Sequence, residues 1–265
     1  MRALKTYLAG GFKDSPEKSG RVHSIFERAA NIAFGRTMIT VLDNADAEIP
    51  DSVLLARGDF AKFAASICAG APAFAGGGAI ASGGARIDIA GVPNADNFFG
   101  AIPPFDKSAA AKKFAEFGFY HVLPERAEAA LKRAAEALAQ NDAASAAKEA
   151  AKTIGFGAGL TPAADDAILG IEAFLEAVGS PCARPFAEAA CAAAQGRTTD
   201  ASLKYLRCAA QGRFALPLVR AVKSLAGAEG AIDYGALSIV LAAGHSSGKD
   251  TMRGVKIMAE NLLNL

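Results

Sequence analysis

The two halves of the chain differ in how apolar and polar residues follow one another. In the first half the apolar stretches are short: residues 36–43 (RTMITVLD) are rich in β-branched side chains, and residues 85–90 (ARIDIA) alternate polar and apolar positions. Both patterns are typical of strands. Residues 59–69 differ, because their apolar side chains recur at helical spacing after Asp59, a favourable helix cap. We therefore expect a β-rich N-terminal half that includes one short helix.

Three other stretches of this half carry weaker signals. Residues 1–20 form a polar lead-in, and residues 21–34 are amphipathic in a way that suits either a helix or a strand at their start. Residues 70–92 are dense in glycine but have apolar residues between the glycines, which indicates tight hairpins or bulges and not an open linker. Pro103 and Pro104 end this half, so we place the domain boundary after residue 104.

From residue 105 onwards the pattern is that of helices. Apolar residues recur three and four positions apart, alanine is abundant, and glycine or a capping aspartate separates the segments. Residues 237–242 (LSIVLA) suit a strand equally well. The predicted helices are 107–117, 124–139, 142–153, 162–178, 184–195, 200–211, 214–226, 232–242 and 250–263. The chain is thus predicted to be an α+β protein with a β-rich domain at residues 1–104 and a helical domain at residues 105–265.

Composition and charge narrow the class of protein. At 265 residues and 52% hydrophobic, the chain can form a substantial core, and a net charge of +1 gives no sign of a nucleic-acid partner. We expect no membrane span, because no 18-residue apolar stretch is free of charge or glycine. The N-terminal residues lack the apolar run of a signal peptide, and the four cysteines form no C-x-x-C motif. These features predict a cytoplasmic protein with reduced thiols.

Residues 153–170 (TIGFGAGLTPAADDAILG) carry the strongest candidate site. Glycines stand there at alternate positions, where the missing Cβ atoms let a ligand approach the backbone, namely at Gly155, Gly157 and Gly159. Thr161 is expected to cap a helix whose first residue is Pro162, and it is also a candidate for holding an anion together with the loop N–H groups. Free N–H groups and the dipole at such a helix start favour an anion.

Two carboxylates follow in the first turn of that helix. Asp165 and Asp166 would repel an anion alone, whereas Mg²⁺ bound by both could bridge carboxylate and phosphate. Asp166 shares a helical face with Gly170, Ala173 and Ala177, so it should point into a tight gap between helices. A carboxylate in such a gap must be hydrogen-bonded, ion-paired or metal-bound. The alternative for both aspartates is a structural role as acceptors for neighbouring N–H groups.

Two later loops have the same form, with glycine and hydroxyl residues before a helix and an aspartate near its first turn. They are residues 196–202 (GRTTDAS) and 244–251 (GHSSGKDT). Their candidate ligand-binding residues are Thr198, Thr199, Ser202, Ser246, Ser247, Gly248 and Lys249. His245 is a candidate for moving a proton, and Asp250 for orienting a nitrogen or holding Mg²⁺. Helix capping explains each loop taken singly, but three such loops favour a shared pocket for a small phosphate or carboxylate anion.

Other familiar sites fit less well. The third loop departs from a P-loop, because Ala243 takes the place of the first glycine and Asp250 that of the final serine or threonine. The alternating glycines of the first loop follow a predicted helix and not a strand, which disfavours a dinucleotide fold. No Cys/His cluster indicates zinc. Residues 244–248 (GHSSG) have the letters of the G-x-S-x-G motif, but we infer no hydrolase nucleophile from them. His121 is expected to lie in the core or at its boundary.

These motifs resemble those of the AllH-like family. Residues 155–170 are similar to the family's G-x-G-x-G-L-T-P-S-G-D-D-x-x-x-G, and residues 244–254 (GHSSGKDTMRG) to its G-x-S-S-G-x-D-x-x-x-G. The middle loop resembles the family's T-T-x-x-S, and residues 20–24 (GRVHS) with Asn31 resemble its opening. The first motif departs from the family at residues 163–164, where Ala-Ala replaces Ser-Gly and removes a hydroxyl from the helix start.

The resemblance implies a subunit of the oxamate carbamoyltransferase of anaerobic allantoin degradation, a branch of purine catabolism. That enzyme converts oxalurate and phosphate into oxamate and carbamoyl phosphate, and the resemblance implies an FdrA-like partner subunit. Both oxalurate and carbamoyl phosphate are small anions of the kind that the three loops suit. Two alternatives stay open: a non-catalytic partner subunit or metabolite-binding module, and a phosphotransferase with a degenerate P-loop.

Overall fold

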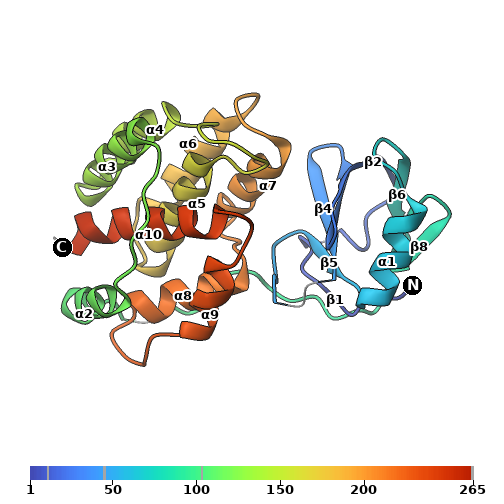
Figure 1. Ribbon diagram of the computed structural model, residues 1–265, viewed down its shortest axis with the longest axis horizontal. Coiled ribbons are helices and arrows are strands. Elements are labelled where there is room, and N and C mark those ends of the chain that lie inside the picture. Colours follow the sequence, from blue (N-terminus) through green and yellow to red (C-terminus); the bar gives the residue numbers. More distant parts are fainter. Residues whose placement is uncertain (11, 44–45, 103, 264–265) are drawn as a thin grey trace. The chain divides into compact units, whose positions relative to one another are not determined.

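The computed structural model describes residues 1–10, 12–43, 46–102 and 104–263 (Figure 1). The chain divides into two compact units, Met1–Asn97 and Phe98–Leu265, and each has a hydrophobic core of its own. The first unit holds a sheet and one helix, and the second is helical. The predicted α+β class is therefore confirmed.

The second unit starts earlier than the sequence suggests. It begins at Phe98, ahead of the expected boundary after residue 104, and Pro103 lies outside the described residues. The start of the unit is held by Lys223, whose Nζ donates a hydrogen bond to the carbonyl oxygen of Phe99 (2.8 Å). This contact ties residues before the prolines to the helices and explains the early division.

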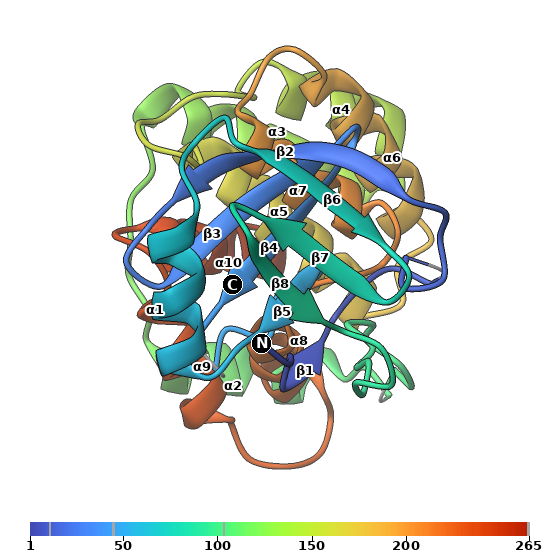
Figure 2. The same ribbon diagram turned by 90° about the vertical axis from the view of Figure 1, so that its right-hand side faces the viewer.

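The first unit is built on one mixed sheet. Its strands are β1 (Lys5–Thr6), β2 (Lys18–Ile25), β3 (Ala29–Phe34), β4 (Thr37–Leu42), β5 (Ser52–Leu54), β6 (Pro72–Gly76), β7 (Ala79–Ser82) and β8 (Ala85–Asp88). They form a curled sheet in the order β1-β5-β4-β3-β2-β6-β7-β8, in which β4 and β5 are parallel and the other pairs antiparallel (Figure 2). Helix α1 (Arg57–Ser66) packs on the sheet, and its Phe60 and Phe63 belong to the common core.

The predicted strands are present, and the stretches with weaker signals also form strands. Residues 21–34 form the β2–β3 hairpin, and the supposed lead-in contains β1 and the start of β2. The glycine-rich stretch folds into the hairpins of β6, β7 and β8, whose turns use glycines with positive φ. The expected cap of α1 was wrong, because Ala56 and not Asp59 precedes the first helical residue. Asp59 lies within the first turn, where its charge complements the helix dipole.

The second unit packs its helices around α5. They are α2 (Lys107–Phe117), α3 (Glu125–Ala139), α4 (Ala143–Ala151), α5 (Ala163–Ala177), α6 (Ala183–Ala194), α7 (Asp200–Ala209), α8 (Leu216–Ala226), α9 (Tyr234–Leu241) and α10 (Ser247–Leu263). Each predicted helix is present, and residues 237–242 prove to be largely helical. Across the described residues, none of the helices combines the length and the apolar character that a membrane crossing requires.

Helices α5 and α10 approach each other at two glycines (Figure 1). A Cβ atom at Gly170 of α5 would overlap the carbonyl oxygen of Thr251 in α10, and one at Gly254 of α10 would overlap the carbonyl oxygen of Ala167 in α5. The backbones therefore touch with no side chain between them. This contact brings the starts of the two helices, and the aspartates in them, close together.

Candidate functional site

The three loops picked out from the sequence converge at the starts of α5, α7 and α10. Asp165 joins the first loop to the second, since it accepts hydrogen bonds from Gly155 N and from the Ser202 hydroxyl. Thr161 joins the first loop to the third through a hydroxyl contact with Ser247 at 2.7 Å. We call residues 155–162, 198–202 and 244–250, with the aspartates that follow the first loop, the three-loop site.

Asp165 is a buried acceptor that connects two loops of this site. Its side chain is 1% exposed, and its Oδ1 accepts from Gly155 N at 2.8 Å. Its Oδ2 accepts from the hydroxyls of Thr198 and Ser202, the latter at 2.7 Å. Both carboxylate oxygens thus have protein donors. This arrangement favours the structural interpretation of Asp165 over direct contact with a substrate.

The start of α5 is built differently from the expectation. Pro162 is the N-cap with extended backbone (ψ 140°), and α5 begins at Ala163, so Thr161 does not cap the helix as predicted. A proline ring at residue 162 holds Thr161 away from the helix axis, and its hydroxyl contacts Ser247 instead. The loop also uses the helix start itself, because Ala164 N donates to Phe156 O at 3.0 Å. The N–H groups here bind their own loop, which weakens the case for an anion at this helix end.

The second loop does behave as a cap. Thr199 is the N-cap of α7, and its hydroxyl accepts from Ser202 N at 3.1 Å while donating to the carbonyl oxygen of Leu160. In the third loop α10 begins at Ser247, three residues before the predicted start at Asp250. The capping and cross-loop contacts together fix the geometry of all three loops.

Asp166 and Asp250 are the groups of the site that the protein leaves incompletely bonded. They are 5% and 3% exposed, and the Oδ2 atom of each is buried with no hydrogen-bond partner among the described residues. Burial raises the pKa of Asp166 to about 8, although hydrogen bonds from the hydroxyls of Ser247 and Thr161 lower it; the neighbouring charges of Asp250 and Asp165 raise it further. The three-loop site therefore contains two buried oxygens that lack donors.

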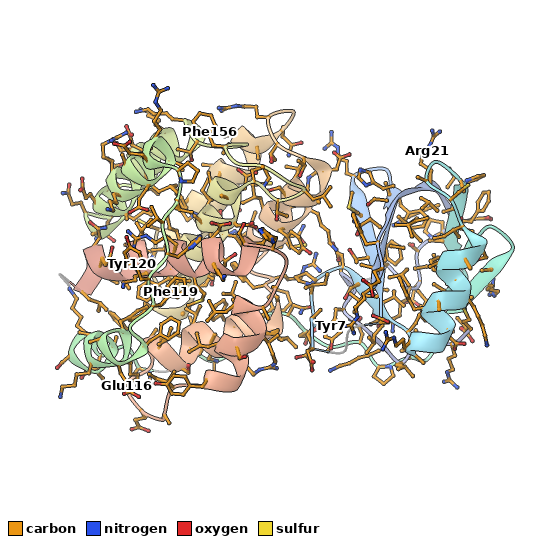
Figure 3. All side chains as sticks on the ribbon, in the orientation of Figure 1. Tyr7, Arg21, Glu116, Phe119, Tyr120 and Phe156 are labelled. Atoms are coloured by element: carbon orange, nitrogen blue, oxygen red, sulfur yellow. The ribbon has the colours of Figure 1, made fainter. Side chains whose placement is uncertain are left out.

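His121, which the sequence placed in the core or at its boundary, completes the site. His121 lies in the extended segment between α2 and α3, and its Nε2 is 2.8 Å from Oδ1 of Asp250. The ring is partly exposed, with 23% of the side chain accessible. The neighbouring Tyr120 is 84% exposed, and Phe119 lies beside it (Figure 3). The pair is 129 residues apart in the chain, so no spacing or motif could have connected them.

Two candidate residues of the third loop, His245 and Lys249, make fewer contacts than expected. His245 and Lys249 are exposed and show no hydrogen bond or ion pair in the described part of the chain. Arg253, one turn beyond Lys249 on α10, is 8% exposed and binds Glu128 (2.6 Å) and Glu260 (3.2 Å). The catalytic role of His245 and the ligand-binding role of Lys249 stay predictions, with no contact here to support them.

A magnesium ion fits these residues poorly. Both oxygens of Asp165 accept hydrogen bonds from the protein, and one oxygen of Asp166 is buried without a hydrogen-bond partner among the described residues. Within the described residues no three His, Cys, Asp or Glu side chains come together as a set of metal ligands. We therefore assign no chemical step to Mg²⁺.

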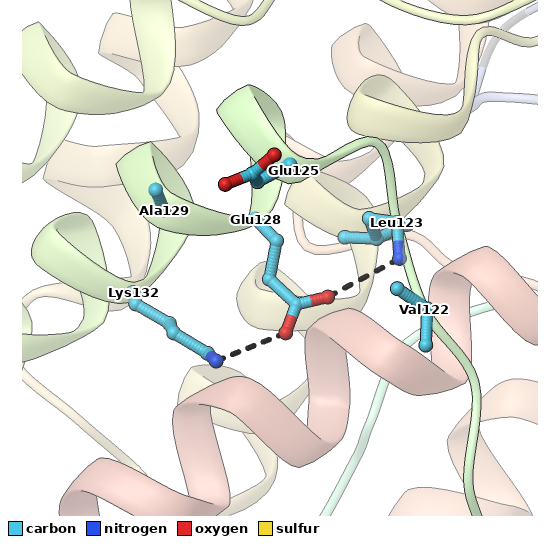
Figure 4. A pocket seen from close by; sticks show the side chains of 6 residues that line it. All are labelled: Val122, Leu123, Glu125, Glu128, Ala129 and Lys132. Carbon is cyan, nitrogen blue, oxygen red and sulfur yellow. Dashed lines mark hydrogen bonds and ion pairs between the residues drawn. The ribbon is translucent and has the colours of Figure 1, made fainter.

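A pocket of about 420 Å³ opens beside the segment that carries His121 (Figure 4). It is lined by Val122, Leu123, Glu125, Glu128, Ala129 and Lys132. Although burial raises the pKa of Glu128, hydrogen bonds from Arg253, Lys132 and the backbone N–H of Leu123 lower it to about 2. Glu128 is therefore a charged anchor that holds this segment between α3 and α10.

Residues 20–24 and Asn31, which resemble the opening motif of the family, take part in a row of hydrogen bonds across the sheet of the first unit. The hydroxyl of Thr40 donates to Asn31 Oδ1 at 2.8 Å, and Asn31 Nδ2 donates to the Ser24 hydroxyl at 3.1 Å. Nδ1 of His23 is 3.1 Å from the same hydroxyl. The polar residues of this motif thus have a clear structural role within the first unit.

Glu172, two turns beyond Asp165 on α5, is a buried acid outside the three-loop site. It is 1% exposed, and neither of its carboxylate oxygens has a hydrogen-bond partner among the described residues. Burial, reinforced by the charge of Glu176, raises the pKa of Glu172 well above its ordinary value of 4.5. The folded protein therefore holds this proton more tightly than the unfolded chain does.

We expect the free energy of unfolding to fall as the pH rises from about 5 to 8. Below pH 4.5 both states keep the proton of Glu172, whereas above it only the folded state does, so stability is lost toward the raised folded pKa. Glu172→Gln should reduce the difference between the free energies of unfolding measured with urea at pH 5 and at pH 8. Glu188→Gln, which changes an exposed acid on α6, is the control and should leave the slope unchanged. An unaltered slope in Glu172→Gln would show that another group carries it.

The chain matches the AllH family in two separate ranges. Residues 3–94 match the AllH family N-terminal domain, and residues 153–259 match the family described as oxamate carbamoyltransferase subunit AllH. The second match includes all three loops of the site, both starts of the touching helices and Glu172, while His121 lies outside both matched ranges. No solved structure matches the chain.

Proposed function

This chain belongs to the AllH family, which is described as a subunit of oxamate carbamoyltransferase. We propose that the three-loop site binds the carbamoyl-bearing substrate of such a complex. The reaction would transfer the carbamoyl group of oxalurate to phosphate and yield oxamate and carbamoyl phosphate. An FdrA-like chain would be a partner subunit. The proposed ligand is thus a small anion with a planar group that carries N–H donors next to a negative charge.

The observation that carries this proposal is the pair of buried carboxylate oxygens without donors. Oδ2 of Asp166 and Oδ2 of Asp250 belong to two helices that touch through their backbones. A buried acceptor without a donor costs about 1–3 kcal/mol, and a ligand that supplies donors recovers that free energy. The –NH₂ of a carbamoyl or oxamate group supplies two N–H donors and no positive charge.

The charge state of Asp166 suits a ligand that is also an anion. With a pKa raised to about 8, this carboxyl is mostly neutral near pH 7 in the empty site, which limits its repulsion of an approaching anion. Hydrogen bonds from the ligand to Oδ2 favour the ionised form. Binding at pH 7 should therefore expel a proton from Asp166.

The non-catalytic interpretation has one observation in its favour. The bonds of Asp165, Thr161 and Thr199 lock the three loops together without any ligand. A locked site can bind a metabolite without turning it over. The phosphotransferase alternative has less support, because Lys249 is exposed and Asp250 is bonded to His121.

Calorimetry on the assembled complex tests the proposal. Oxamate binding at pH 7, measured in buffers of different ionisation enthalpy, should release up to one proton in the wild type. Asp166→Asn replaces the acceptor with an amide that cannot ionise, so it should abolish the proton release and weaken binding by at least about tenfold. Turnover should fall by about 100-fold or more, while the thermal midpoint stays close to that of the wild type.

Glu188→Gln on the exposed face of α6 is the matched control for this experiment. It should bind oxamate with the wild-type affinity and proton count. Full turnover by Asp166→Asn would exclude a catalytic site here and leave the non-catalytic subunit. A collapse of the thermal midpoint in that variant would assign Asp166 a structural role instead.

A further inference from the structure

We infer that His121 is the catalytic residue that carries the proton in this carbamoyl transfer, through its Nδ1 atom. The inference rests on the proposed function of the three-loop site and adds a residue that lies outside the three loops. It starts from the contact between Nε2 of His121 and Oδ1 of Asp250 at 2.8 Å. His121 is the histidine of the described residues that pairs with a carboxylate in this site.

The contact with Asp250 selects one tautomer of the ring. A carboxylate oxygen is an acceptor, so Nε2 carries the hydrogen and donates it to Asp250. Nδ1 then keeps its lone pair, which makes it a proton acceptor. No hydrogen bond to Nδ1 is present among the described residues, and the partly exposed ring is reachable from outside. Asp250 thus orients the imidazole in the way that a base requires.

The segment that carries His121 is held at both ends. Lys256 Nζ donates to the carbonyl oxygen of Phe119 at 2.6 Å, two residues before His121. Glu128 accepts a hydrogen bond from Leu123 N at 3.2 Å, two residues after it. The ring centroid of His121 is 6.3 Å from that of Phe119. The imidazole is therefore placed by its surroundings and not by Asp250 alone.

Charged groups from three helices lie around His121. Asp250 of α10 contacts it directly, and Asp166 of α5 lies near enough to Asp250 for its charge to be felt. Glu128 of α3 and Arg253 of α10 neutralise each other at 2.6 Å, and Lys256 is occupied by the backbone. Asp250 is therefore the carboxylate that contacts the ring directly.

The proton has a defined course in the proposed reaction. An oxygen of HPO₄²⁻ attacks the carbamoyl carbon of oxalurate, and its hydrogen passes to Nδ1 of His121. The bond between that carbon and the amide nitrogen then breaks, and Nδ1 returns the proton to this nitrogen. The products are carbamoyl phosphate and oxamate, so atoms and charge balance with no further reactant.

Turnover by the assembled complex of His121→Gln tests the inference. The glutamine amide can still donate to Asp250, but it cannot accept and return a proton. Turnover should fall by at least about 100-fold, with the thermal midpoint and the oxamate affinity near those of the wild type. In His121→Ala, added imidazole should restore part of the activity, because the ring is partly exposed.

Wild-type turnover by His121→Gln would overturn the inference and reduce His121 to an anchor of its segment. NMR of the ¹⁵N-labelled imidazole gives a second measurement that needs no activity. An Nε2–H tautomer in the wild type, and its loss in Asp250→Asn, are expected; an Nδ1–H tautomer would overturn the inference. Failure of the wild type to bind oxamate would instead count against the proposed function, so the two failures are distinguishable.

Discussion

Gly170→Ala is expected to destabilise the helical unit by about 3 kcal/mol or more, because the added methyl group has no space. Its Cβ would overlap the carbonyl oxygen of Thr251 and would lie 2.9 Å from the backbone nitrogen of Val255. A backbone cannot move aside as a side chain does, so α5 and α10 must separate. The thermal midpoint should fall by roughly 2–4 °C for each kcal/mol, measured by calorimetry. The separation should also remove oxamate binding, since it moves Asp166 away from Asp250.

Gly58→Ala is the control for the added methyl group. Gly58 lies in the first turn of α1 with open space around the position of a Cβ atom. This variant should change the stability of its own unit by less than about 1 kcal/mol, in the stabilising direction. Gly254→Ala should resemble Gly170→Ala, and the two together should cost less than their sum, since both open the same contact. A wild-type midpoint for Gly170→Ala would mean that the two helices do not touch as described.

Asp165→Ala should destabilise the protein by about 3 kcal/mol or more. The change leaves three donors without their acceptor: Gly155 N and the hydroxyls of Thr198 and Ser202. Each lost bond to a charged acceptor is worth about 1.5–3 kcal/mol, and neighbouring losses are not additive. Urea unfolding should show the loss as a lower midpoint with an unchanged slope.

Asp165→Asn separates the acceptor from the charge. Its amide oxygen can keep one of the bonds, and the hydroxyls of Thr198 and Ser202 can rotate to accept from the amide N–H groups. We expect a loss smaller than that of Asp165→Ala by at least about 1 kcal/mol. Equal losses would show that charge, and not the number of acceptors, holds the loops. A wild-type midpoint for Asp165→Ala would remove the structural role of this residue.

Much of the helical unit could be predicted from the sequence, because local signals and tertiary packing agree there. Asp142 and Asp233 cap α4 and α9 through their side chains, at positions next to the predicted helix starts. The sheet was harder, because β3 and β4 bury most of their residues on both faces and so lose the alternation that marks a half-buried strand. The convergence of the loops was a hypothesis from their shared form. The contacts of Asp165 join the first two loops, and the contact between Thr161 and Ser247 adds the third.

The parts of the site that could not be predicted depend on contacts between distant residues. Asp165 and Asp166 are adjacent and chemically alike, yet one is saturated with donors and the other has a buried oxygen without any. Neighbouring residues of a helix point about 100° apart, so only the packing decides which meets donors. His121 reaches Asp250 from an irregular segment, and irregular segments have no periodicity from which a contact can be inferred.

The contact between α5 and α10 has a two-fold symmetry that the sequence repeats. Gly170 follows Asp166 by four residues and meets Thr251, while Gly254 follows Asp250 by four residues and meets Ala167. Each glycine therefore rests on the residue just after the other helix's aspartate, so the two Asp-x-x-x-Gly segments are related by a local dyad. One ligand group that satisfies the free Oδ2 atoms of both aspartates must offer two donors. A planar –NH₂ group carries two such donors, whereas a single hydroxyl or a secondary amide carries one.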